Sequence, residues 1–191
     1  MIMAQEIEIE FKNLLTEQEY KKLLDFFKLD PSQGIVQTNH YFETKDFQLK
    51  SKSSALRIRE KDNLFQLTLK EPHPEGLLET HDPLTKAEAK SWIDGEIIPK
   101  PHVANQLNQL SIDFAKLRYG GALSTRRIET VYKETVIVLD YSTYNGNTDY
   151  ELEIEAKDKL HGEAVFNEII NELAITKKET PNKIERFYKS L

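Results

Sequence analysis

The sequence predicts an α+β protein in which one curved antiparallel β-sheet carries helices on its outer side. Several stretches alternate apolar and charged residues, and this alternation is the period of a β-strand. Two such stretches, 6–12 and 151–157, each place three glutamates and a lysine on one face. Amphipathic helical patterns lie between the predicted strands and at the end of the chain, where they can cover the apolar faces.

The bulk composition fits one folded domain. The chain has 191 residues, of which 39% are hydrophobic and 30% are charged, so we expect a single domain over 1–191. It has no Cys, which excludes disulfides, thiol nucleophiles and Cys-ligated zinc and fits a reducing compartment. We expect no signal peptide before Gln5, and the longest apolar run, 136–139, is too short to cross a bilayer. We therefore expect a cytoplasmic protein without a membrane partner.

The charge balance limits the classes of ligand. A net charge of −6 argues against a broad basic face for nucleic acid, although it allows a local basic pocket. The five histidines show no metal-ligand spacing and are interpreted as surface or core residues: His40, His73, His81, His102 and His161.

The first elements are a strand, a helix and a second strand. After the strand over 6–12, Thr16 and Glu19 form a capping box, which predicts a helix over about 17–28. Its apolar stripe ends before Pro31 and Gly34, and a strand is expected over 35–43. The stripe consists of Tyr20, Leu23, Leu24 and Phe27.

The middle of the chain reads as a meander. Alternating stretches over 55–61 and 64–70 are joined by a turn at 61–63, and a Pro- and Gly-containing loop over 71–76 leads to a strand over 77–80. The apolar faces hold four aliphatic residues, and the opposite faces are basic. The aliphatic residues are Leu56, Ile58, Leu67 and Leu69.

The second half begins with helices over 84–110 that break at Gly95 and at 99–101. A long strand over 116–132, a strand over 135–141 and an Asn145-Gly146 hairpin turn then lead into the second acidic strand. Two helices follow. The first has the stripe Phe166, Ile169, Ile170 and Leu173.

The last helix is expected to be capped by Thr180, with Pro181 at its first position. Lys183 would lie in the first turn, where the helix dipole disfavours a cation by about 0.3–1 kcal/mol. A bound anion would reverse that cost. An ordinary solvated lysine is the alternative interpretation.

The charged faces predict a ligand-binding interior. If the apolar faces lie under the helices, the charged faces enclose a lumen, and unpaired charge there would be costly without water, counterions or a ligand. Guanidinium and ammonium groups bind phosphate oxygens, and clustered carboxylates bind hard dications. A polyanion with divalent cations fits both. The cations are Lys12, Arg57, Arg59, Lys70 and Arg127, and the carboxylates are Glu6, Glu8, Glu10, Glu151, Glu153 and Glu155, with Glu79 and Asp140 in addition.

The spacing Glu8-x-Glu10-x-Lys12 reproduces an ExExK motif, and further matching segments follow in order. With these segments the sequence resembles the CYTH superfamily, the triphosphate tunnel metalloenzymes, which includes class IV adenylyl cyclases and thiamine triphosphatases. The match looks closest to small single-domain bacterial members. The segments are 56–59, 67–70, Arg127, Asp140, 151–155 and 182–187.

The resemblance implies a closed antiparallel eight-stranded β-barrel, or tunnel, with a charged interior and helices packed outside. By position it implies that Mg²⁺ or Mn²⁺ is bound by Glu8 and Glu10, with Asp140, Glu151, Glu153 and Glu155 as candidates for a second metal ion or the attacking water. Which of the last three glutamates serve is open. It implies the phosphate-binding residues Lys12, Arg57, Arg59, Lys70, Arg127 and Lys183, and the catalytic residues Lys12, Asp140 and Glu153.

The expected function is metal-dependent hydrolysis of a small-molecule triphosphate, either inorganic triphosphate or a nucleoside or thiamine triphosphate. Three alternatives remain: an adenylyl cyclase on the same site, a non-catalytic module that binds polyphosphate or nucleotide, and a lipocalin-like barrel with solvated outer strands. The oligomeric state is open, with a homodimer as one option.

Overall fold

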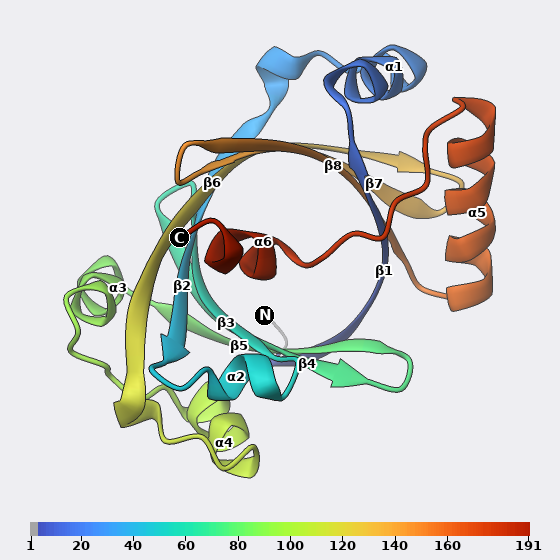
Figure 1. Cartoon of the computed structure of the whole chain (residues 1–191). Coiled ribbons are helices and arrows are strands. Elements are labelled where there is room, and N and C mark those ends of the chain that lie inside the picture. Colours follow the sequence, from blue (N-terminus) through green and yellow to red (C-terminus); the bar gives the residue numbers. More distant parts are fainter. Residues whose placement is uncertain (1–3) are drawn as a thin grey trace. The chain divides into compact units, whose positions relative to one another are not determined.

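The alternating stretches form the strands of a closed antiparallel barrel, which confirms the predicted fold class (Figure 1). The structure is a computed structural model that describes residues 4–191. The strand order around the barrel is β1-β5-β4-β3-β2-β6-β7-β8. The strands are β1 (Gln5–Leu15), β2 (Ile35–Thr44), β3 (Ala55–Lys61), β4 (Leu64–His73), β5 (Gly76–Leu84), β6 (Leu117–Tyr132), β7 (Thr135–Tyr144) and β8 (Asn147–Ala156).

Two of the helices begin at capping boxes. Thr16 and Glu19 form the expected capping box of α1, and Thr85 and Glu88 form a second one at α3. The α-helices are α1 (Glu17–Phe27), α2 (Gln48–Ser51), α3 (Lys86–Ile93), α4 (Pro101–Gln109), α5 (Lys159–Glu172) and α6 (Lys183–Lys189), and the 3₁₀ helices are η1 (Pro31–Gln33) and η2 (Phe114–Lys116).

The chain divides into two compact units. The first contains the start of the described chain up to Ile7 together with Gln37–Ala122, and the second contains Glu8–Val36 together with Leu123–Leu191. Each unit has a hydrophobic core of its own. The two are therefore described separately.

In the first unit, α3 and α4 cover the apolar face of the meander. Ile58 and Leu69 are fully buried there with Trp92 of α3 and Leu107 of α4. Burial of each such side chain stabilises the fold by about 1.5–3 kcal/mol. The alternate residues, Arg57 among them, lie on the opposite strand face, because successive side chains of a strand point to opposite sides.

In the second unit, α1 and α5 cover β7 and β8. Leu139 and Leu152 pack in one buried cluster with Leu23 of α1 and Ile169 of α5. Helix α5 comes very close to the sheet at Gly162, where an added Cβ would lie 2.6 Å from the Cβ of Ala156 and 2.7 Å from the ring of Phe11. Only glycine fits this approach.

Two expected loop and cap features are wrong. The loop expected over 71–76 is a two-residue turn, because Glu71, Pro72 and His73 continue to pair with β5. Helix α6 starts two residues later than expected, at Lys183 instead of Pro181, with Asn182 at its N-cap. Thr180 does not cap it, because its hydroxyl accepts a hydrogen bond from the backbone N–H of Leu14, at 2.9 Å.

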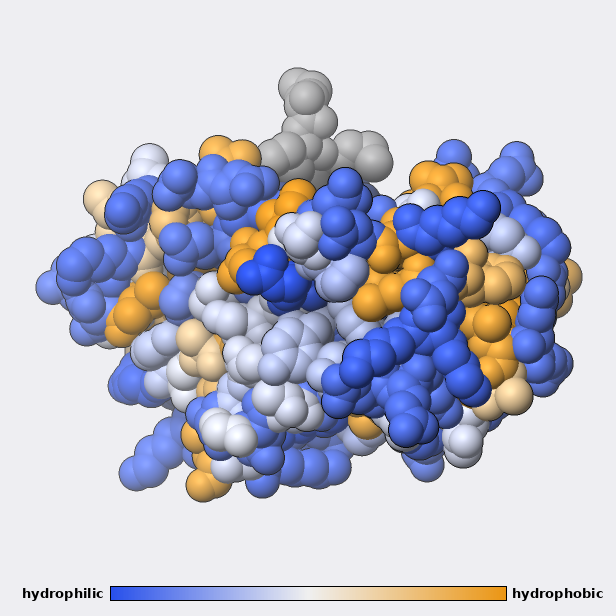
Figure 2. All heavy atoms as spheres, turned by 90° about the horizontal axis from the view of Figure 1, so that it is seen from above, coloured by the Kyte–Doolittle hydropathy of each residue, from blue (hydrophilic) through white to orange (hydrophobic). Residues whose placement is uncertain are grey.

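The strand expected over 77–80 is longer, as β5 extends to Leu84, so the helical stretch expected from 84 begins at Lys86. The expected hairpin turns are confirmed. Asp62 and Asn63, like Asn145 and Gly146, have the positive φ values of a type I′ hairpin. Within residues 4–191 no helix is both long and apolar enough to span a bilayer. Hydrophilic residues cover most of the face drawn in Figure 2. The expectation about a signal peptide concerns residues 1–3, which lie outside the described part.

Candidate metal-binding and phosphate-binding residues

The second unit gathers most of the predicted carboxylates on one strand face. Glu10 of β1 lies directly opposite Glu155 of β8, and Lys12 lies opposite Glu153. Asp140 of β7 lies opposite Glu151 of β8 in the same way. Directly opposed residues share a face, and this face is the one that α1 and α5 leave uncovered, because Leu152 and Ile154 alternate with these glutamates.

Arg127 binds two of these carboxylates. Its Nε and Nη2 donate to the two oxygens of Asp140, at 2.8 and 2.7 Å, and Nη2 also donates to Glu153 Oε2 at 2.8 Å. This fork geometry is the strongest form of an ion pair. Arg126, the adjacent residue, points to the other face and donates to the carbonyl of Gly34.

Lys183 binds the same carboxylates from the first turn of α6. Its Nζ lies 2.9 Å from Asp140 Oδ2 and 3.1 Å from Glu151 Oε1, and it also contacts Glu153. The solvated interpretation of Lys183 is thereby wrong. Arg186, one turn later, donates to Asp149 at 2.8 Å and pairs with Glu151. Arg186 was assigned no role from the sequence, although its spacing of three from Lys183 places both on one helix face.

The network keeps Glu153 and Lys183 charged. Burial opposes the charge of Glu153, but Lys183 and Arg127 outweigh it and hold the pKa of Glu153 well below its usual range. Burial likewise opposes the charge of Lys183, and Asp140, Glu153 and Glu151 together raise its pKa above the usual value. Arg127 and Lys183 are therefore engaged by carboxylates of the protein itself.

Two glutamates of β8 have raised pKa values. Burial, with the charge of Glu8 added, raises the pKa of Glu155 to about 7. Burial also raises the pKa of Glu151 to about 7, and the neighbouring Glu153 adds to this against the effect of Lys183 and Arg186. A dication beside Glu155 and Glu8 would remove their repulsion, so this pair of carboxylates suits a hard metal ion.

The beginning of β1 supplies the rest of the motif. Glu8 and Glu10 are partly buried, and Lys12 Nζ lies 3.5 Å from Glu10 Oε1. Lys12 also contacts the side-chain carbonyl of Asn182, the N-cap of α6. The motif thus offers two carboxylates for a cation and one ammonium group for an anion.

The first unit holds the other predicted cations. Lys70 Nζ lies 2.7 Å and Arg57 Nη2 3.7 Å from Glu79 Oε1. Burial opposes the charge of Glu79, but Lys70 and Arg57 lower its pKa to about 2. Arg59 donates to Asn39 Oδ1 at 3.1 Å. The Nε of Arg57 is buried without a hydrogen-bond partner among the described residues, and such a donor suits an anionic ligand.

His81 lies against two carboxylates. It was interpreted as a surface or core residue, and it is buried; its Nε2 lies 3.0 Å from Glu6 Oε1 and 3.3 Å from Glu79 Oε2. These three residues form a group that can hold a metal ion. Glu79 and His81 are two positions apart on β5 and therefore share a strand face. The pairing of β1 with β5 brings in Glu6 from 75 positions away, and no short-range spacing indicates that contact.

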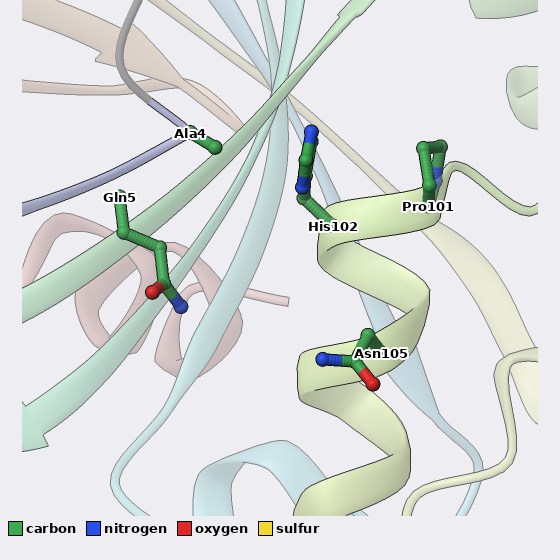
Figure 3. Close-up of a pocket in the computed structure, with 5 residues that line it drawn as sticks. All are labelled: Ala4, Gln5, Pro101, His102 and Asn105. Carbon is green, nitrogen blue, oxygen red and sulfur yellow. The ribbon is translucent and has the colours of Figure 1, made fainter.

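A pocket of about 340 Å³ lies elsewhere in the first unit (Figure 3). Figure 3 shows Gln5 from the start of β1 beside His102 and Asn105 of α4. Its lining is completed by Ala4 and Pro101 and contains no carboxylate, lysine or arginine. None of the predicted site residues is among these five, and the pocket has no charge for a metal ion or polyanion.

Comparisons with known proteins agree with this chemistry. A protein of Bacillus subtilis (strain 168) named "Putative triphosphatase YjbK" is 45% identical over 186 residues, which are 97% of this chain and 96% of that protein. The crystal structure of a Bacillus halodurans protein, described as a "putative adenylate cyclase", has a TM-score of 0.94 at 45% identity and covers 97% of this chain and 100% of its own.

A more distant structure shows the same fold. HpAC1 from Hippeastrum has a TM-score of 0.73 at 21% identity, with 96% of each chain covered. Residues 6–188 match the CYTH domain family. From this match and the 45% identity to YjbK, we conclude that the chain belongs to the CYTH domain family.

Proposed function

We propose that this protein is a divalent-metal-dependent phosphohydrolase that acts on a small-molecule triphosphate. The family and the relative named as a triphosphatase support this reaction class. The observation that carries the proposal is the buried group in which Arg127 and Lys183 hold Asp140 and Glu153. This group contains both the cations that bind phosphate and the carboxylates that bind metal ions or water.

We assign the metal ion, Mg²⁺ or Mn²⁺, to Glu8, Glu10 and Glu155. All three are carboxylates of the second unit, Glu10 and Glu155 are directly opposed across β1 and β8, and Glu8 acts electrostatically on Glu155. A dication bound there supplies charge neutralisation to phosphate oxygens and acidifies a water molecule. The proposed phosphate-binding residues are Lys12, Arg57, Arg59, Lys70, Arg127 and Lys183.

Asp140 and Glu153 have two roles in this proposal. Without substrate they hold Arg127 and Lys183 in place. When phosphate oxygens take over these cations, a carboxylate is released, and it accepts a proton from the attacking water. The water oxygen bonds to the terminal phosphorus, the bridging P–O bond breaks, and the shortened phosphate chain leaves. Glu151 serves the same group through Lys183 and Arg186.

Adenylyl cyclase activity is the second candidate, and it is favoured by the description of the Bacillus halodurans relative. A cyclase needs the ribose 3′-hydroxyl to attack the α-phosphate, so it releases pyrophosphate and a cyclic nucleotide. A module that only binds polyphosphate would release neither.

We further propose that residues 1–191 act as one domain in the cytoplasm, with no nucleic-acid partner.

Product analysis separates these functions. Purified protein is incubated with inorganic triphosphate, ATP or thiamine triphosphate, with Mg²⁺ or Mn²⁺, and orthophosphate, pyrophosphate and cyclic AMP are measured. We expect metal-dependent orthophosphate release that Glu10→Gln abolishes and that Glu163→Gln, an exposed glutamate of α5, leaves unchanged. Cyclic AMP as the main product would establish the cyclase. Turnover of Glu10→Gln at the wild-type rate would refute the metal assignment.

A further inference from the structure

The first unit contains a group of possible metal ligands to which the proposed reaction assigns no metal ion. The group consists of Glu6, Glu79 and His81. The Nε2 atom of His81 faces one oxygen of each glutamate, at 3.0 and 3.3 Å. One ligand atom from each of the three residues lies within 4.8 Å of the others. Burial differs among them, since His81 and Glu79 are buried while the Glu6 side chain is 51% exposed.

These distances match those between ligands of one metal ion. With metal–ligand bonds of about 2.0–2.1 Å, two ligand atoms are about 3.3 Å apart at a tetrahedral angle and about 2.9 Å apart at a right angle. The observed separations lie in this range. A single N–H bond, in contrast, can be directed well at only one of the two oxygens, whereas a metal ion between the three atoms contacts both.

The ligand atoms are held in orientation by neighbours. His81 Nδ1 lies 2.9 Å from the hydroxyl oxygen of Thr68, a buried residue. When Nδ1–H donates to this oxygen, the lone pair of Nε2 points toward the two glutamates. Glu79 is fixed similarly, because Lys70 binds its Oε1 at 2.7 Å while its Oε2 faces His81. Metal-binding histidines and carboxylates characteristically have such partners.

We propose that Glu6, Glu79 and His81 bind a transition-metal dication of the Zn²⁺ class. One imidazole nitrogen with two carboxylate oxygens suits Zn²⁺, Co²⁺ or Mn²⁺ better than Mg²⁺, which prefers oxygen ligands and retains its water. The half-exposed Glu6 gives the ion access from solvent and leaves a coordination position for water. This site shares no ligand with the proposed ligands Glu8 and Glu10, and it does not depend on the proposed hydrolysis.

The test is calorimetric titration of the full-length protein with ZnCl₂ in excess Mg²⁺, which occupies sites made of carboxylates alone. We expect one Zn²⁺ to bind. His81→Asn keeps a donor for Thr68 but removes Nε2, so it should weaken this binding at least about tenfold. Glu6→Gln should weaken it similarly. His102→Asn, at an exposed histidine of α4, is the matched control and should bind as the wild type does.

Two results would overturn the proposal. The first is wild-type Zn²⁺ affinity in His81→Asn or Glu6→Gln, which would leave His81 as a hydrogen-bonding residue between two carboxylates. The second is loss of the Zn²⁺ site in Glu8→Gln/Glu10→Gln, which would place the ion at the other carboxylates. Thermal unfolding checks that each variant is folded. If His81→Asn does not fold, Glu6→Gln decides, because half of its side chain is in solvent and its loss does not threaten the core.

Discussion

Replacing Asp140 by Asn tests whether the buried charges of the second unit stabilise one another. The Asp140 side chain is fully buried and receives Arg127 in a two-pronged pair and Lys183 at 2.9 Å. Asn keeps the shape but removes the negative charge, so two buried cations lose a partner. Breaking a buried ion pair in this way costs about 3–5 kcal/mol.

We expect the lower end of that range, about 3 kcal/mol, because Glu153 still binds both cations and Asn retains one acceptor oxygen. For a chain of this length each kcal/mol shifts Tm by about 2–4 °C, so Tm should fall by about 6–12 °C. The assay is urea and thermal unfolding followed by circular dichroism, with metal ions removed by EDTA. Asp25→Asn, at an exposed position of α1, is the control and should change Tm little.

The same variant should respond more strongly to an anion. With Asp140 uncharged, Arg127 and Lys183 carry excess positive charge, so inorganic triphosphate without metal should raise the Tm of Asp140→Asn more than that of the wild type. A Tm within about 2 °C of the wild type, together with lost hydrolysis, would refute the reasoning. It would show that Asp140 serves catalysis without holding the buried cations.

Three further perturbations follow from pKa values and packing. Glu79 has a pKa lowered to about 2 from 4.5, so the stability that it contributes is present above about pH 4.5 and is lost as the pH falls toward 2. In EDTA, Glu79→Gln should lower the unfolding free energy at neutral pH and should reduce the further decrease in that free energy at acidic pH. Glu155 has a pKa raised to about 7, so between about pH 4.5 and 7 the folded state retains a proton that the unfolded state loses. The unfolding free energy therefore falls as the pH rises through that window. Glu155→Gln should reduce this pH dependence of the unfolding free energy, and an unchanged dependence would contradict the raised pKa. Gly162→Ala should lower the unfolding free energy in urea by about 1–3 kcal/mol, because the new Cβ would overlap Ala156 and Phe11. The control Glu163→Ala, on the same helix, should change it little. A Gly162→Ala variant that is more stable than the wild type would refute the close approach.

The barrel could be predicted because each strand has a recognisable local sequence pattern. Alternation with period two fixes which residues share a face, and hairpin turns such as Asn145-Gly146 fix where the chain reverses. The errors lie where a residue is used by a distant segment. Thr180 was expected to cap the last helix, but its hydroxyl accepts a hydrogen bond from the backbone N–H of Leu14. No local sequence pattern indicates this distant contact.

The site was predicted as a set of residue types, and its internal pairing was not. The sign of each strand face indicated that cations and carboxylates would meet. It did not indicate that Arg127 and Lys183 both bind Asp140, because this depends on the register of β6 and β7 and on the placement of α6. The contact of His81 with Glu6 was missed because the two residues are 75 positions apart in the sequence.

Because Arg127 and Lys183 are paired with internal carboxylates, an anion from solution can bind them only if it displaces these carboxylates. Any incoming anion competes with neighbours that are covalently tethered and therefore present at high effective concentration. A singly or doubly charged ion such as chloride or orthophosphate has too little charge to displace several of them at once, whereas a longer phosphate chain exchanges many contacts together. On the proposed function, orthophosphate should accordingly be a weak competitor of inorganic triphosphate in binding titrations.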